Sequence, residues 1–195
     1  MFIKDWKKEV FTVPNVLSLF RLALIPVYIV MYLNAVTTTD YYLAAAVLAV
    51  SCLTDMIDGK IARHFNMIST VGKVLDPFAD KATQFTLIVC LAVRYPNLWY
   101  LVALFAVKEI FQLVAGLVNY KKGKMLKGAL MSGKICTTVL FLSLIVMVMI
   151  PNLPPEVVNG IALVDGTFLI FAFSRYAYTY FSMDPRFLIE EGKEN

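Results

Sequence analysis

Four aspartates fall in two pairs within otherwise apolar sequence, and these residues are the best suited to chemistry. Asp55 and Asp58 are three positions apart, and Asp76 and Asp80 are four positions apart. On helices, these spacings place each pair on one face. Four ionised carboxylates gathered at low dielectric repel one another, so they must take up protons or hold cations. Because every ligand atom is an oxygen, hard cations such as Mg²⁺, Mn²⁺ or Ca²⁺ fit better than zinc.

The residues beside the acids suit a phosphate-bearing substrate. Gly59 lets the backbone approach a ligand closely, and Ala62 keeps the same helix face open. Arg63 can bind a phosphate through two N–H groups of its guanidinium. Gly72 precedes the second acid pair, and Pro77 is expected either to occupy the first turn of that helix or to kink it.

The composition indicates where these acids must function. Of 195 residues, 59% are hydrophobic and only 16% are charged, whereas soluble domains have about 25% charged residues. The apolar runs are about 20 residues long, which favours membrane-spanning helices over a barrel. We therefore predict an all-α integral membrane protein with six transmembrane helices, near residues 14–35, 41–63, 73–95, 98–120, 130–150 and 156–182.

The basic residues predict the orientation of these spans and the division of the chain. Lysines gather before the first span and between the fourth and fifth, at positions 4, 7, 8, 121, 122, 124 and 127. Both termini and the active site are therefore expected on the cytoplasmic side, with the net charge of +4 facing anionic headgroups. We predict a juxtamembrane amphipathic helix over 1–12, a six-helix domain over 13–183 and a cytoplasmic tail over 184–195. Lysines that flank spans do not indicate nucleic-acid binding.

This topology places the four acids at a similar depth. At 1.5 Å per residue, Asp55 should lie about 20 Å from the outer end of its span. Asp76 and Asp80 enter the membrane from the cytoplasmic side. We therefore expect the four carboxylates to meet in the cytoplasmic half of the bilayer.

The complete pattern resembles the signature of the CDP-alcohol phosphotransferase family at every position. It reads Asp55-x-x-Asp58-Gly59-x-x-Ala62-Arg63, then eight residues, then Gly72-x-x-x-Asp76-x-x-x-Asp80. The resemblance implies an enzyme that transfers a substituted phosphate from a CDP-linked donor, typically CDP-diacylglycerol, to an alcohol and releases CMP. It also implies assembly as a homodimer.

The resemblance further implies a role for each signature residue. Two divalent cations, Mg²⁺ or Mn²⁺, would be held by Asp55, Asp58 and Asp76, with Asp80 as both metal neighbour and general base. The CDP-lipid would be bordered by Asp55, Asp58, Gly59, Ala62, Arg63 and Gly72. Since the only histidine is His64 in the basic turn, we expect direct in-line attack without a covalent enzyme intermediate.

The acceptor is less constrained than the donor. Residues 12–21 and 75–81 resemble bacterial phosphatidylglycerophosphate synthases and the related cardiolipin synthases of the cytoplasmic membrane. We favour glycerol 3-phosphate as acceptor, with phosphatidylglycerol, inositol phosphate or serine as alternatives. A phosphorylated acceptor needs cations near spans, and the candidates are Lys81, Lys134, Arg175 and Arg21. Lys108 and Glu109 are either a structural pair or part of this site.

Three alternatives outside the enzyme class are weaker. A cation transporter tends to place acids near the midplane between repeated halves, but here they lie toward one side and the sequence has no repeat. A structural ion network would pair the acids separately with Lys60, Lys73 or Lys81. A non-catalytic assembly scaffold is weaker still, because packing alone does not require four acids, the two glycines and Arg63. Release of CMP from CDP-diacylglycerol separates an enzyme from all three.

Overall fold

The computed structural model describes residues 12–64, 72–121, 124–126, 130–182 and 188–190. For residues 55–64, Lys73 and the strands it describes only the backbone. The predicted juxtamembrane helix over 1–12 lies almost wholly outside the described residues. The chain forms two compact units, an N-terminal unit of Met1–Cys90 with Val148–Pro151 and a C-terminal unit of Leu91–Met147 with Asn152–Asn195.

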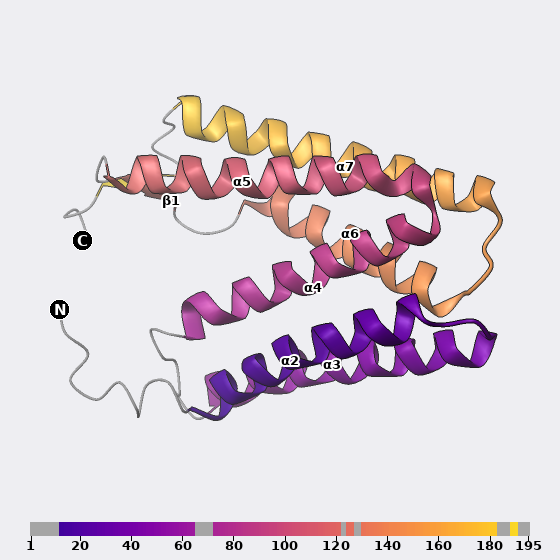
Figure 1. Cartoon of the computed structure of the whole chain (residues 1–195). Helices are drawn as coiled ribbons and strands as arrows, with labels where there is room; N and C mark the ends of the chain where they lie inside the picture. Colours follow the sequence, from indigo (N-terminus) through magenta and orange to yellow (C-terminus); the bar gives the residue numbers. More distant parts are fainter. Residues whose placement is uncertain (1–11, 65–71, 122–123, 127–129, 183–187, 191–195) are drawn as a thin grey trace. The chain divides into compact units, whose positions relative to one another are not determined.

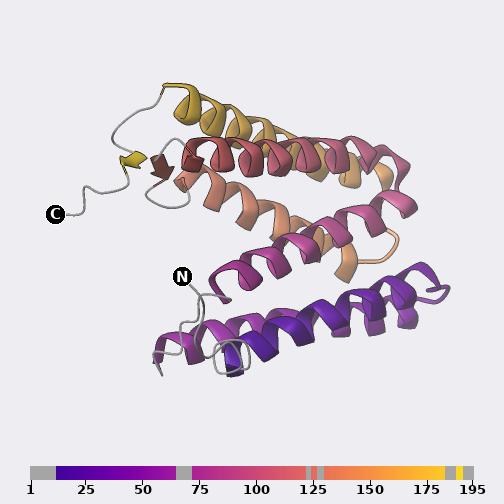
Figure 2. The ribbon, with the colours of Figure 1, turned by 60° about the vertical axis from the view of Figure 1, so that its left-hand side comes forward.

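The N-terminal unit contains α2 (Val13–Leu33), α3 (Thr38–His64) and most of α4 (Gly72–Arg94). Figures 1 and 2 both show α2 and α3 side by side along their length. A reciprocal cap begins α3: the Thr37 amide donates to Asp40 Oδ2 over 2.7 Å, and the Asp40 amide donates to Thr37 Oγ1 over 3.3 Å. These bonds satisfy amides that the first helical turn leaves without partners, and so fix where α3 starts.

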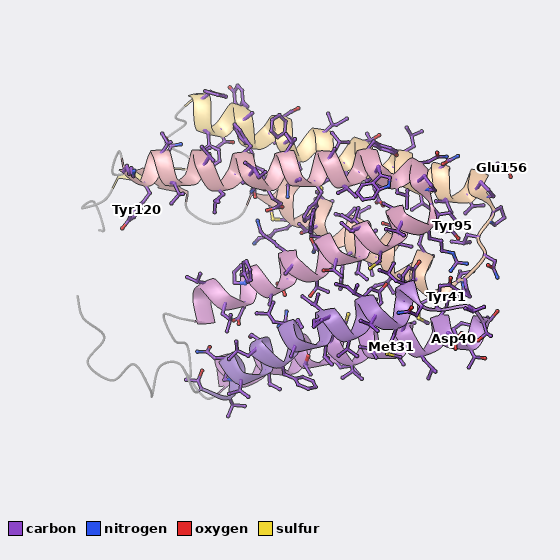
Figure 3. The ribbon with its side chains drawn as sticks, viewed as in Figure 1. Met31, Asp40, Tyr41, Tyr95, Tyr120 and Glu156 are labelled. Carbon is purple, nitrogen blue, oxygen red and sulfur yellow. The ribbon has the colours of Figure 1, made fainter. Side chains whose placement is uncertain are left out.

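The C-terminal unit contains a short 3₁₀ turn η1 (Pro96–Leu98), α5 (Trp99–Lys121), most of α6 (Met131–Met149) and α7 (Pro155–Ser182). Helices α5 and α7 lie side by side in both views (Figures 1 and 2). The rings of Phe111 and Phe173 meet edge to face between them, with centroids 5.0 Å apart. Figure 3 shows Tyr95 and Glu156 at one end of this unit and Tyr120 at the other.

A small antiparallel ribbon pairs β1 (Lys124–Leu126) with β2 (Leu188–Glu190), and Lys124 lies opposite Glu190. The ribbon joins the α5–α6 connection to the predicted tail over 184–195. The all-α prediction is confirmed for the six long helices, whose ends fall within a few residues of the predicted spans. The two strands were not predicted, because segments of only three residues show no recognisable strand pattern in the sequence.

The helices have the length and surface of membrane spans. Within the described residues, four helical segments are long and apolar enough to cross a bilayer, namely Val13–Leu33, Pro96–Lys121, Met131–Met149 and Pro155–Ser182. The described apolar part of α3, Thr38–Thr54, is shorter. Large apolar side chains such as Leu113 and Leu163 are 66% and 70% exposed, which indicates a lipid-facing surface. The chain is therefore an integral membrane protein, while the count of six spans stays a prediction.

Candidate active site

Two helices of the N-terminal unit carry the whole signature. The backbone of α3 is continuous through positions 55, 58, 59, 62 and 63, and α4 begins at Gly72. The side chains of the five α3 residues lie outside the described part of the structure, so the meeting of all four acids stays a prediction. Pro77 lies in the interior of α4 and not in its first turn, so one of the two placements expected for it is excluded.

Asp76 is held by a serine on α2. The hydroxyl of Ser18 lies 2.5 Å from Asp76 Oδ1 and 3.1 Å from the carbonyl oxygen of Pro14. Ser18 is fully buried, whereas Asp76 is half-buried. A charge-assisted hydrogen bond of this kind is short and directional, so it fixes the rotation of the carboxylate.

Asp80 is held in the same way, one helical turn further along α4. Its Oδ1 forms an ion pair with the guanidinium of Arg21 on α2. The Arg21 side chain is 3% exposed and that of Asp80 is 47% exposed. The arginine therefore approaches Asp80 from the protein interior.

Three buried polar residues form one face of α2. Asn15, Ser18 and Arg21 are spaced by three positions and are 1%, 0% and 3% exposed. The sequence prediction assigned Arg21 to the acceptor and gave no role to Asn15 or Ser18. Their three-residue spacing in an otherwise apolar span could have identified them, because polar residues inside a span face a protein interior.

The other predicted acceptor cations are exposed and lie on three helices. Lys81 follows Asp80 on α4 in the N-terminal unit, whereas Lys134 on α6 and Arg175 on α7 belong to the C-terminal unit. Within that unit, Tyr176 packs directly across Gly133. Lys134 and Arg175 therefore flank the point where α6 and α7 meet.

Lys108 and Glu109 form an ion pair within α5. The Lys108 Nζ atom lies 2.5 Å from Glu109 Oε1, although neighbouring residues on a helix point in different directions. The ammonium also lies 5.8 Å from the centre of the Phe105 ring. With Lys108 only 2% exposed, the long lysine stem bends back to keep a buried charge paired.

One buried acid escaped the sequence prediction. Asp165 in α7 has no exposed surface, and its Oδ2 accepts a 2.6 Å hydrogen bond from Ser143 of α6. Its Oδ1 has no hydrogen-bond partner among the described residues. A lone acid near the middle of an apolar span was the available signal.

The donor set of the predicted metal site consists of oxygens. Asp76 and Asp80 lie one turn apart on one face of α4, and Asp80 is half-exposed. These two carboxylates fit a hard divalent cation, because such cations prefer oxygen ligands and Asp80 is open to a ligand. Within the described side chains no group of three or more acidic, histidine or cysteine ligands occurs, and Asp55 and Asp58 are not among those side chains.

Beyond the acids, α2, α3 and α4 enclose a mostly apolar hollow. Its lining includes Leu24, Tyr28, Leu48, Ser51, Thr83 and Leu87. These residues lie about one or two turns from Arg21, Asp55 and Asp80 along their own helices. A small, mostly apolar hollow therefore lies next to the acidic face within the N-terminal unit.

Known proteins share this sequence pattern. A profile of the CDP-alcohol phosphatidyltransferase family matches residues 11–173. The CMP-forming cardiolipin synthase of Streptomyces coelicolor is 35% identical over 115 residues, which are 57% of this chain and 53% of that protein. The CDP-diacylglycerol–glycerol-3-phosphate 3-phosphatidyltransferase of Escherichia coli is 35% identical over 89 residues, 46% of this chain and 48% of that protein.

A third relative shows that the shared region can be part of a larger protein. The Schizosaccharomyces pombe fusion of a CMP-forming cardiolipin synthase and a mitochondrial hydrolase is 36% identical over 121 residues, 62% of this chain and 19% of that protein. The chain thus spans about half or less of the length of the relatives it matches. Because the family profile covers most of the chain, including α2 to α6 and all signature positions, the chain belongs to the CDP-alcohol phosphatidyltransferase family.

Proposed function

We propose that this protein transfers the phosphatidyl group of CDP-diacylglycerol to glycerol 3-phosphate, releasing CMP and forming phosphatidylglycerophosphate. The observation that carries the proposal is the paired acidic face of α4, with Asp76 and Asp80 each held in place from α2. It lies within the region that matches the family. The match to the Escherichia coli transferase supports the choice of acceptor.

The reaction is a single displacement at phosphorus. The acceptor hydroxyl oxygen bonds to the phosphorus that bears the diacylglycerol, and the bond from that phosphorus to the CMP oxygen breaks. Asp80 is half-exposed and takes the proton of the attacking hydroxyl as general base. Arg63 binds a phosphate of the donor, and Gly59 and Ala62 leave room for the cytidine diphosphate.

Asp55, Asp58, Asp76 and Asp80 would hold two divalent cations, Mg²⁺ or Mn²⁺. When bound, these cations neutralise charge on the phosphoryl oxygens and on the departing CMP. The Ser18 and Arg21 contacts are compatible with this use, because each engages Oδ1 of its carboxylate from the buried side.

The membrane setting suits a lipid donor. We propose six spans with both termini and the acids on the cytoplasmic side, where glycerol 3-phosphate and CMP are soluble. The homodimer that the family resemblance implies stays a prediction, which the mass of the detergent-solubilised protein tests.

Cardiolipin synthesis, with phosphatidylglycerol as the acceptor, is the second candidate. The observation in its favour is that the alignment to the Streptomyces coelicolor cardiolipin synthase covers 57% of the chain, against 46% for the glycerol-3-phosphate transferase. Both candidates use the same donor and the same acids. They differ in the acceptor: glycerol 3-phosphate is water-soluble and carries a phosphate monoester, whereas phosphatidylglycerol is a lipid with a phosphodiester.

A comparison of acceptors tests the proposal. Purified protein is incubated with CDP-diacylglycerol and Mg²⁺ or Mn²⁺, and CMP release is measured with glycerol 3-phosphate, phosphatidylglycerol, inositol phosphate or serine. We expect release to depend on glycerol 3-phosphate and to yield phosphatidylglycerophosphate. Cardiolipin as the product would select the second candidate, and ion flux without CMP release would contradict both.

A further inference from the structure

Building on the proposed function, we propose that Ser18 and Arg21 are positioning residues of the active site. In this proposal α2 provides a buried polar face that orients the two carboxylates of α4. Ser18 orients Asp76, and Arg21 orients Asp80. Neither side chain binds the acceptor.

The geometry of the two contacts is alike. Both α2 residues engage the Oδ1 atom of their carboxylate, and Ser18 and Arg21 are three residues apart while Asp76 and Asp80 are four apart. Two side chains from one face of α2 therefore reach two carboxylates on one face of α4. Together these contacts fix the rotation of both acids.

The burial of Ser18 and Arg21 favours a positioning role over binding of the acceptor. A residue that binds a soluble phosphate must reach it, but Arg21 is 3% exposed and Ser18 has no exposed surface. Asp80 is 47% exposed. A molecule that reaches the exposed part of Asp80 therefore meets the carboxylate and not the buried guanidinium.

Removing the Ser18 or Arg21 contact is expected to lower kcat by a moderate factor. Groups that orient a ligand or a base typically change affinity or activity by about 10- to 100-fold when removed. A carboxylate that rotates freely spends less time in the geometry that accepts a proton. Because Asp80 is half-exposed, water can solvate it when Arg21 is replaced, so the variant should fold.

The test compares kcat and KM for the acceptor in four variants. We expect Arg21→Met to lower kcat by about 10- to 100-fold and to leave the KM for glycerol 3-phosphate unchanged. Arg21→Lys should recover part of the loss, since it keeps the charge but not the planar fork. Ser18→Ala should lower kcat by about tenfold, and Ser18→Thr should restore it because the hydroxyl remains.

Ser143→Ala is the matched control. Ser143 also donates a short hydrogen bond to an aspartate on a neighbouring helix, at 2.6 Å, but that aspartate, Asp165, is not a signature acid, and both residues belong to the C-terminal unit. We expect this variant to lower the thermal midpoint in detergent and to keep kcat. The same midpoint measurement on the Ser18 and Arg21 variants separates lost folding from lost turnover.

Each other outcome contradicts the proposal in a distinct way. A raised KM with unchanged kcat in Arg21→Met would make Arg21 an acceptor ligand. Unchanged kcat in both Arg21→Met and Ser18→Ala would reduce their bonds to packing. Wild-type protein that releases no CMP with any acceptor would overturn the proposed function as well, whereas active wild-type protein with unaffected variants overturns only this inference.

Discussion

In each of two regions of the molecule, a serine hydroxyl donates a hydrogen bond to an aspartate on a neighbouring helix. We assign the two aspartates different roles. In the N-terminal unit, Ser18 of α2 lies 2.5 Å from Asp76 of α4. In the C-terminal unit, Ser143 of α6 lies 2.6 Å from Asp165 of α7. The bonds are nearly equal in length, so the hydrogen bond alone does not make an acid reactive.

The surroundings of the two acids differ. Asp76 is half-buried and has Asp80, which is 47% exposed, one turn away on the same face. Asp165 has no exposed surface, and its Oδ1 lacks a hydrogen-bond partner among the described residues. An acid that substrate must reach needs an open side and neighbours that share a ligand. Asp165 has neither, so we interpret it as a link between α6 and α7.

Replacing the proposed base should have the largest effect. We expect Asp80→Asn to lower kcat by about 10²- to 10⁴-fold, because the amide cannot accept the hydroxyl proton. Binding of CDP-diacylglycerol should persist, whereas Asp55→Ala should also lose metal-dependent binding of the donor. Equilibrium binding and CMP release on the same preparations check both statements. A wild-type rate for Asp80→Asn would exclude its role as base.

The helices and the signature were predictable from the sequence because both depend on local features. Apolar runs of span length placed α2 and α3 within a few residues of their observed bounds. The spacing of Asp76 and Asp80 placed them on one face of α4. Nothing in the sequence of α4 indicates that side chains of α2 contact those two acids.

Contacts between helices were the part that sequence reasoning missed. The Ser18–Asp76 bond joins residues 58 positions apart, and the Arg21–Asp80 pair joins residues 59 apart. Such contacts depend on how two helices rotate against each other, which hydrophobic length does not specify. The Ser143–Asp165 bond between α6 and α7 is a contact of the same kind. The β1–β2 ribbon forms only because two distant segments meet.

A second prediction concerns the packing of the C-terminal unit. In Gly133→Ala, the new Cβ would lie 2.8 Å from Tyr176 Cε2 and 3.0 Å from its Cζ, which is too close. Tyr176 is 4% exposed and stacks on Tyr180, so its ring has little room to move. We expect a loss of about 1–3 kcal/mol in stability, seen as a lower thermal midpoint in detergent.

Gly160→Ala is the control for this change. A Cβ at Gly160 meets nothing within 4 Å, and alanine favours a helix interior by about 0.5–1 kcal/mol. We expect this variant to be equally or more stable. Equal stability of Gly133→Ala and Gly160→Ala would show that Tyr176 yields without cost.

A third prediction asks whether the C-terminal unit contributes acceptor recognition. We expect Lys134→Met and Arg175→Met to raise the KM for glycerol 3-phosphate by about tenfold, the loss of one charge-assisted hydrogen bond of roughly 1.4 kcal/mol. Lys121→Met, at the end of α5, is the control and should behave as wild type. Unchanged KM values in both variants would limit acceptor binding to the N-terminal unit.

The smallest effect concerns Asp40, a partly exposed acid without a proposed role in catalysis. The backbone amides of Thr37 and then Val36, followed by the Thr37 hydroxyl, lower the pKa of Asp40 below its usual value of 3.8. Because the folded pKa is depressed, its stabilising effect is present above the unfolded pKa and lost as pH falls through the folded value. The thermal midpoints of wild type and Asp40→Ala should therefore converge as the pH is lowered below about 4. A constant difference would show that the cap does not depend on ionised Asp40.

The most direct test of the comparison measures CMP release from CDP-diacylglycerol by wild type, Asp76→Asn and Asp165→Asn, prepared and assayed together. Asparagine keeps an oxygen that can accept the serine hydrogen bond in both variants and removes the charge. We predict that Asp76→Asn loses nearly all activity while Asp165→Asn retains it at an equal or higher thermal midpoint. Full activity in Asp76→Asn, or its loss in folded Asp165→Asn, would contradict the assignment of chemistry to α4 and of packing to α7.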